Sequence, residues 1–191
     1  MTMPRYIAFL RAINVGSHTV KMEKLRALFE SLEFSKVETF IASGNVIFET
    51  KSSKAQALQT GIEKLLLQSL GYEVATFIRT DAEVADIAQY RPFADSALQS
   101  AQALNVAFLA EPLPGEAKKA LMGLKTDIDD FHAHGREAYW LCRKKQSEST
   151  FSNAVFERTL KIQTTFRGFN TVVRLTAKYP PSPKGGEGET R

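Results

Sequence analysis

The order of apolar segments predicts an α+β protein of two subdomains in tandem, each a ferredoxin-like βαββαβ unit, with an extra C-terminal helix. Short runs of β-branched and aromatic residues alternate with longer segments in which apolar residues recur every three or four positions. These patterns are typical of buried strands and of amphipathic helices. The same order of segments occurs twice within the 191 residues. In such a unit both helices lie on one side of an antiparallel sheet, so the other sheet face needs a second covering layer.

In the first half, the strand pattern covers residues 5–12, 36–43, 46–50 and 72–80. A helix is predicted from Lys21, with Thr19 as its N-cap. A second helix follows the serines at 52 and 53, and Gly71 suits the position just beyond its end. The Ser-Gly-Asn segment at 43–45 separates two strands and predicts a β-hairpin.

The second half repeats this order. Strands are predicted over residues 103–110, 128–134, 137–143 and 161–166, and helices over 116–125, 151–160 and 168–179. We therefore predict an N-terminal subdomain with a linker helix over residues 1–90 and a C-terminal subdomain over 91–179, with a linker at 93–102. Residues 180–191 are rich in proline and glycine, and we expect them to be disordered.

Composition excludes several classes of protein. Apolar residues make up 43% of the chain and charged residues 24%, which is close to the average of globular domains. No apolar run approaches the roughly 18 residues of a membrane-spanning helix. Cys142 is the only cysteine, so neither an intramolecular disulfide nor a cysteine-rich zinc site can form. Without a signal-peptide pattern at the start, we expect a cytoplasmic protein.

The net charge of +4 is unevenly distributed. Residues 1–90 carry 10 Lys/Arg and 10 Asp/Glu, whereas residues 136–178 carry 9 and 3. A local excess of positive charge can attract an anionic partner, although a solvated basic face gives the same count.

Three stretches together resemble the family known as "domain of unknown function 1697". They are LRAINVGSHTVKM at 10–22, TFIASGNVIFE at 39–49 and SNAVFERTLKIQTTFRGFNTVVRL at 152–175. Members of that family open with an LRGINVGG-like segment, carry a SGNVxF hairpin and end with a TxRNWNTV-like segment. The resemblance implies two ferredoxin-like α+β subdomains and brings no established activity, substrate or cofactor. This chain departs from the pattern at Ala12, Ser17, Gly168 and Phe169.

Polar residues at the ends of the predicted elements form a candidate site for an anionic ligand. A glycine-containing strand-to-helix loop can direct backbone N–H groups at a phosphate, and arginine can bind it in bidentate fashion. The alternative is that these residues only form turns and internal ion pairs, and no phosphate-loop fingerprint is present. The candidate residues are Arg11, Asn14, Gly16, Lys21, Ser43, Asn45, Arg167 and Asn170.

The histidines and aromatic residues give weaker indications of function. His132 and His134 share one face of a predicted strand, which fits a solvated face better than a metal site. His18 lies in the first loop and could act as an acid or base. Most aromatic residues of the predicted strands are interpreted as core residues, because the sequence fingerprint of the RNA-recognition motif is absent. The basic run from Arg143 to Lys145 is the best local case for nucleic-acid backbone contacts, against the alternative of a charged loop.

Three classes of function remain open from the sequence. The leading hypothesis is a binding protein for a phosphate-bearing ligand, either a nucleotide or a nucleic acid. The second is an enzyme acting on a small anionic metabolite, for which the sequence shows no convincing nucleophile, base or metal cluster. The third is a protein-interaction module using a free sheet face, which would also allow a homodimer. No cofactor and no metal are predicted.

Overall fold

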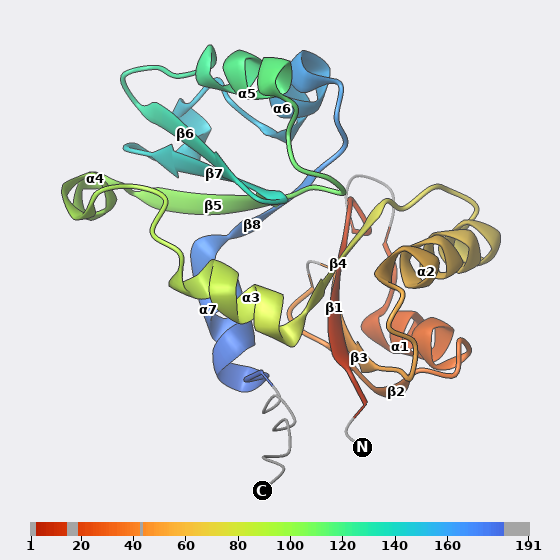
Figure 1. The fold of residues 1–191 in the computed structure, drawn as a ribbon. Coiled ribbons are helices and arrows are strands. Elements are labelled where there is room, and N and C mark those ends of the chain that lie inside the picture. Colours follow the sequence, from red (N-terminus) through yellow and green to blue (C-terminus); the bar gives the residue numbers. More distant parts are fainter. Residues whose placement is uncertain (1–2, 15–18, 43, 182–191) are drawn as a thin grey trace, which may run out of the picture.

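The computed structural model describes residues 3–14, 19–42 and 44–181. Its first half contains four strands and three helices in the order β-α-β-β-α-β-α (Figure 1). They are β1 (Arg5–Leu10), α1 (Met22–Glu30), β2 (Ser35–Thr39), β3 (Asn45–Glu49), α2 (Ala55–Leu70), β4 (Thr76–Thr80) and α3 (Asp81–Gln89).

The second half repeats this order after a short helix, α4 (Asp95–Ser100), which forms where the sequence suggested only a linker. A 3-10 turn, η1 (Gln146–Glu148), precedes its second long helix. The repeated elements are β5 (Ala103–Phe108), α5 (Gly115–Met122), β6 (Asp129–His134), β7 (Glu137–Cys142), α6 (Asn153–Leu160), β8 (Thr165–Gly168) and α7 (Phe169–Lys178).

The two sheets have the same topology, which confirms the predicted fold class. Their strand orders are β2-β3-β1-β4 and β6-β7-β5-β8, and every pair of neighbours is antiparallel. This is the arrangement of a ferredoxin-like unit, because each helix connects two strands that are not neighbours. The predicted boundaries between subdomains stay a prediction, and the predicted disordered tail falls outside the described residues from 182 onward.

Local chemistry explains several of the element ends. Thr80 caps α3: its hydroxyl accepts from the Glu83 backbone N–H while the Glu83 carboxylate accepts from the Thr80 N–H. Gly71 ends α2 in the left-handed conformation, with φ of 81°, as predicted. The predicted cap of α1 was wrong, because Lys21 rather than Thr19 occupies that position and makes no side-chain capping bond.

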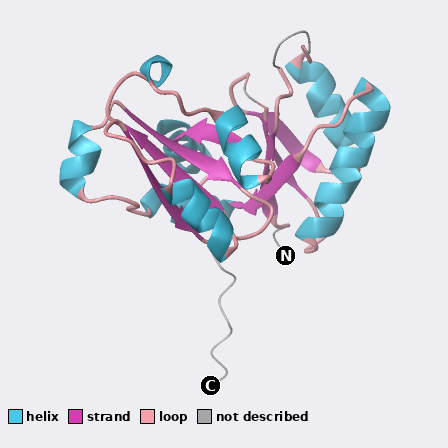
Figure 2. Ribbon diagram, turned by 90° about the horizontal axis from the view of Figure 1, so that it is seen from above, coloured by secondary structure: helices cyan, strands magenta, loops and turns pink. Residues whose placement is uncertain are grey.

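Each sheet buries one face under its own two helices. In the first sheet the alternate β1 residues Tyr6, Ala8 and Leu10 pack against α1 and α2, through residues such as Leu25 and Ile62. In the second sheet the corresponding face packs on α5 and α6. Figure 2 shows the strands of both sheets at the centre of the molecule and helices around them.

The remaining sheet faces pack against each other, a point that the sequence left open. The residues that alternate with those under the helices form one shared core, which Ile7 and Phe9 enter from β1 and Val106 and Phe108 enter from β5. The rings of Phe9 and Phe108 stack with centroids 3.8 Å apart and planes 12° apart. These faces are therefore closed both to the bases of a nucleic acid and to a partner protein.

The two halves match in strand order and in register. Both β4 and β8 run straight into a helix, and those helices, α3 and α7, pack on each other in the angle between the sheets (Figure 1). The β1–β4 register places Arg79 opposite Ile7, and the β5–β8 register places Arg167 opposite Val106. The two arginines therefore occupy equivalent positions in the two sheets.

We expect replacement of Phe108 by alanine to lower the free energy of unfolding by about 3–5 kcal/mol, because it leaves a cavity where both sheets meet. Urea unfolding measures this effect. Met122→Ala is the matched control, since Met122 is 42% exposed and its truncation should cost under about 1 kcal/mol. Equal costs for the two variants would contradict a core shared by both subdomains.

Candidate functional site

Several of the predicted site residues do converge, at the end of β1. The guanidinium of Arg167 reaches from β8 into the first subdomain, where Nε donates to Asn45 Oδ1 at 2.7 Å. Its Nη2 donates to the carbonyls of Leu10 and Gly44, at 2.9 and 3.3 Å. Asn45 in turn donates from Nδ2 to the Phe40 carbonyl. Arg167 and Asn45 are thus in direct contact although 122 residues separate them.

All five N–H donors of Arg167 are used inside the protein. Besides the bonds from Nε and Nη2, Nη1 donates to Thr165 Oγ1 at 2.7 Å and to the Phe166 carbonyl at 2.9 Å. Burial lowers the pKa of Arg167 to about 10, so the side chain is still cationic at neutral pH. Because no donor remains for a ligand, this arginine joins the two subdomains and does not hold an anion.

Arg79 makes the equivalent connection in the opposite direction. From β4 it donates to Glu137 Oε1 at 2.7 Å and to the carbonyls of Leu109 and Arg136, both at 2.9 Å. Its side chain is only 1% exposed. Sequence analysis missed this residue, although a lone arginine within the apolar strand TFIRT is a visible signal for a buried, partnered charge.

Arg11 and Asn14 also have partners within the chain. Arg11 forms a bidentate pair with Glu157 on α6, at 2.7 and 2.6 Å, and the hydrogen bond to this carboxylate raises the pKa of Arg11. Asn14 accepts from the Val20 N–H and donates to the Ala42 carbonyl. Both side chains are therefore engaged in contacts within the protein.

Lys21 and Asn170, the other predicted site residues within the described part of the chain, make no hydrogen bond or ion pair with this cluster. Lys21 is exposed at the start of α1, and Asn170 is exposed in the first turn of α7. Gly16 and Ser43 lie outside the described residues, as does His18. A groove of about 530 Å³ lies beside Arg11. Lys64, Glu63 and Glu73 also line it, so its lining carries as many acidic as basic side chains and does not select for an anion.

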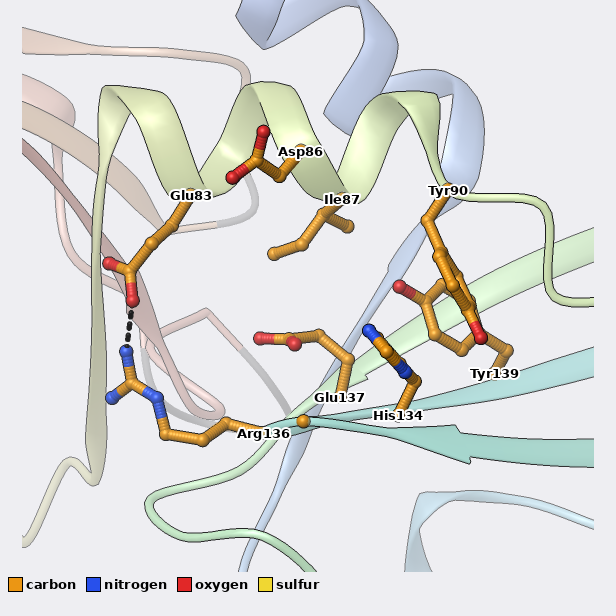
Figure 3. Close-up of a pocket in the computed structure, with 9 residues that line it drawn as sticks. Glu83, Asp86, Ile87, Tyr90, His134, Arg136, Glu137 and Tyr139 are labelled. Atoms are coloured by element: carbon orange, nitrogen blue, oxygen red, sulfur yellow. Dashed lines mark hydrogen bonds and ion pairs between the residues drawn. The ribbon is translucent and has the colours of Figure 1, made fainter.

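A different cleft lies between the subdomains, where α3 faces the β6–β7 hairpin (Figure 3). Its volume is about 320 Å³. The capping residue Glu83 accepts from Arg136 Nη2 of the hairpin at 2.6 Å, which spans one end of the cleft. The lining residues are Glu83, Asp86, Ile87 and Tyr90 of the α3 side, with His134, Gly135, Arg136, Glu137 and Tyr139 of the hairpin.

Aromatic rings form the wall at the other end of this cleft. Tyr90 stacks on His134 with centroids 4.2 Å apart and planes 14° apart. Its hydroxyl lies 2.8 Å from His132 Nε2. The solvated strand face expected for the two histidines holds for His134, which is exposed, whereas His132 is half-buried beside Tyr90. Burial, followed by the nearby His134, lowers the pKa of His132.

Tyr139 supplies an unused polar group to the cleft. Its side chain comes from β7, is 1% exposed and contacts the core shared by the sheets. Its hydroxyl points into the cleft (Figure 3) and has no hydrogen-bond partner among the described residues. Burial, with a further contribution from Glu137, raises the pKa of Tyr139 well above its usual value, so the hydroxyl stays protonated.

The acidic run beside the histidines does not form a metal centre. Asp129 instead accepts from Trp140 Nε1 at 2.7 Å and from Ser149 Oγ at 2.8 Å. Over residues 3–14, 19–42 and 44–181, no group of three His, Cys, Asp or Glu side chains could hold a metal ion. In the same part of the chain, no helix is long and apolar enough to cross a membrane.

The fold and the cleft define a protein of two ferredoxin-like α+β units around a common core. A family model described as "Protein of unknown function (DUF1697)" matches residues 3–139, and the chain belongs to that family. Among curated proteins none matches. A solved structure described as that of the conserved bacterial protein SP0830 from Streptococcus pneumoniae is 22% identical, with a TM-score of 0.72. The match covers 92% of this chain and 98% of that one, so the fold is shared over both subdomains.

We expect Arg167→Met to lower the free energy of unfolding by about 2–4 kcal/mol, because Asn45 and the β1 carbonyls lose buried donors. The control is Arg174→Met, on the exposed side of α7, where a cation–π contact with Phe40 should be worth under about 1 kcal/mol. Chemical denaturation measures both. A cost for Arg167→Met no larger than that of the control would show that the arginine does not join the subdomains.

Stability should also fall as the pH drops through about 6.5, the usual pKa of histidine. The pKa of His132 is lowered in the folded protein, so the unfolded chain takes up a proton that the folded one does not, and protonation favours unfolding. Thermal unfolding between about pH 7.5 and pH 5.5, above the range of most carboxylates, measures this. His132→Gln should flatten that part of the profile, and an unchanged slope would contradict the assignment.

Proposed function

We propose that this protein binds a small molecule in the cleft between α3 and the β6–β7 hairpin. The volume of about 320 Å³ is at the lower end of the range of small-molecule sites. The position between two subdomains is also one that such sites favour. Charged, aromatic and apolar side chains from both subdomains converge there.

The observation that carries the proposal is the Tyr139 hydroxyl. A hydroxyl at the end of so deeply buried a side chain normally has a hydrogen-bond partner, either within the protein or in the space that it faces. Among the described residues the Tyr139 hydroxyl has no hydrogen-bond partner. It faces the cleft, which the Glu137 carboxylate also lines. A bound molecule with a complementary polar group would fill that position.

The alternatives derived from the sequence have less support. A phosphate-bearing ligand at the end of β1 would need free donors, but those of Arg167 are all used and Arg11 is paired with Glu157. Nucleic-acid binding or protein interaction through a sheet face would need a surface that the shared core occupies. A homodimer stays a prediction. A cytoplasmic location is likewise proposed, supported by the single cysteine, Cys142, which is a buried thiol.

Tyr139→Phe tests the proposal because it removes only the hydroxyl. Without ligand, the variant should be as stable as wild type within about 1 kcal/mol, since no hydrogen bond within the protein is lost. The measurement is thermal unfolding of the full chain with a panel of amines, amidines, heterocyclic bases, carboxylates and sugar phosphates. At least one compound should raise the Tm of wild type and raise that of Tyr139→Phe much less.

Tyr179→Phe is the matched control, because its hydroxyl donates to Glu38 Oε2 at 2.6 Å and neither residue lines the cleft. It should lose about 1 kcal/mol of stability and keep the response to the compound. If every compound that stabilises wild type stabilises Tyr139→Phe equally, the cleft is not the binding site.

A further inference from the structure

We infer that the cleft takes a planar cation, an aromatic amine or amidine, whose ring stacks on His134 and whose N–H groups bind Glu137 and Tyr139. This inference rests on the proposed function and names the chemical class of its ligand. Three features of the cleft carry it: the charge of its lining, the acceptors left free there and the ring faces that border it.

The lining carries more negative than positive charge. Glu83, Asp86 and Glu137 are acidic, and Arg136 is the one basic residue among those lining the cleft besides His134. The guanidinium of Arg136 is already paired with Glu83 at 2.6 Å, and Asp86 is exposed at the mouth. Because Glu83 is paired with Arg136 and Glu137 with Arg79, the carboxylate without an ion-pair partner among the described residues is Asp86, which attracts a cation and repels an anion.

Glu137 presents the acceptor at the floor of the cleft. Its side chain is 10% exposed, and Oε1 accepts from Arg79 at 2.7 Å. Its Oε2 has no hydrogen-bond partner among the described residues, and the carboxylate points into the cleft (Figure 3). The Tyr139 hydroxyl faces the same space. The Glu137 carboxylate can accept one N–H group of an amidine or of an amino-substituted ring, and the Tyr139 hydroxyl oxygen can accept another.

The aromatic wall favours a flat ligand. The imidazole of His134 has Tyr90 on one face and the open part of the cleft on the other (Figure 3). Tyr90 is held in place by its hydrogen bond with His132. Ile87, 6% exposed, supplies an apolar surface opposite the hairpin. A ring inserted here would extend the existing stack, and the cleft has room for one or two fused rings.

The test uses flat probes that differ in charge. Calorimetric titration of the full chain compares benzamidine, a planar cation, with benzoate, its anionic counterpart of similar shape, and with acetamidine, which keeps the charge and lacks the ring. We expect measurable binding of benzamidine, weaker binding of acetamidine and none of benzoate. Binding of benzamidine should weaken as salt is added, because part of it is electrostatic.

Three variants assign the contacts. His134→Ala should weaken benzamidine binding between about twofold and tenfold, and His134→Phe should restore it, because only the ring is needed. Asp86→Asn, at an exposed position, should weaken binding about twofold to fivefold and reduce its salt dependence. Tyr139→Phe should weaken it as well. Unfolding free energies close to that of wild type show that each variant is folded.

The outcomes separate the ligand class from the site. Benzoate binding as tightly as benzamidine, or His134→Ala having no effect, overturns the planar cation. If an anion or an aliphatic compound of the larger panel gives the response that depends on Tyr139, the cleft still binds ligands and only the class is wrong. If no compound of any class gives such a response, both the proposed function and this inference fail.

Discussion

The structure depends on a reciprocal exchange of buried arginines between its two subdomains. Arg79 extends from the first sheet and donates to the carbonyl of Leu109, just beyond β5. Arg167 extends from the second sheet and donates to the carbonyl of Leu10, at the end of β1. Each guanidinium also lies over one ring of the Phe9–Phe108 stack, at 5.6 and 5.9 Å from the centroids. Removing two cations from water is costly, and dense hydrogen bonding to carbonyls in fixed positions offsets that cost. The same bonds fix how one sheet sits on the other.

The exchange is similar in geometry but differs in charge, and this difference places a carboxylate in the cleft. Arg79 meets the carboxylate of Glu137, whereas Arg167 meets the amide of Asn45 at the equivalent position of β3. Only the hairpin of the second subdomain therefore brings a carboxylate to the interface. Because Arg79 uses one oxygen of Glu137, the other remains for the cleft. The side chain that joins the halves thus also supplies the acceptor of the candidate site.

The local pattern of the chain predicted most elements correctly and failed where tertiary contacts decide. The fourth strand was predicted over residues 72–80, but pairing with β1 begins only at Thr76. One further bond, from the Arg11 N–H to the Ala75 carbonyl, continues this register, and residues 71–74 form no strand. The linker at 93–102 contains α4, whose six residues are too few for a clear amphipathic pattern. Both errors concern segments whose conformation depends on neighbours distant in the sequence.

The sequence by itself determined the class of fold, because periods of two and of three to four residues report directly which side chains face a core. It also singled out Arg11, Asn45 and Arg167, at the ends of predicted elements, as candidate residues for an anionic ligand. Only the tertiary structure decided that the partners of these residues are inside the protein, and that Tyr90, His134 and Tyr139 meet at one cleft. Residues brought together from α3, β6 and β7 share no local spacing. Their proximity follows from packing two sheets face to face around one phenylalanine pair, a contact between residues 99 positions apart.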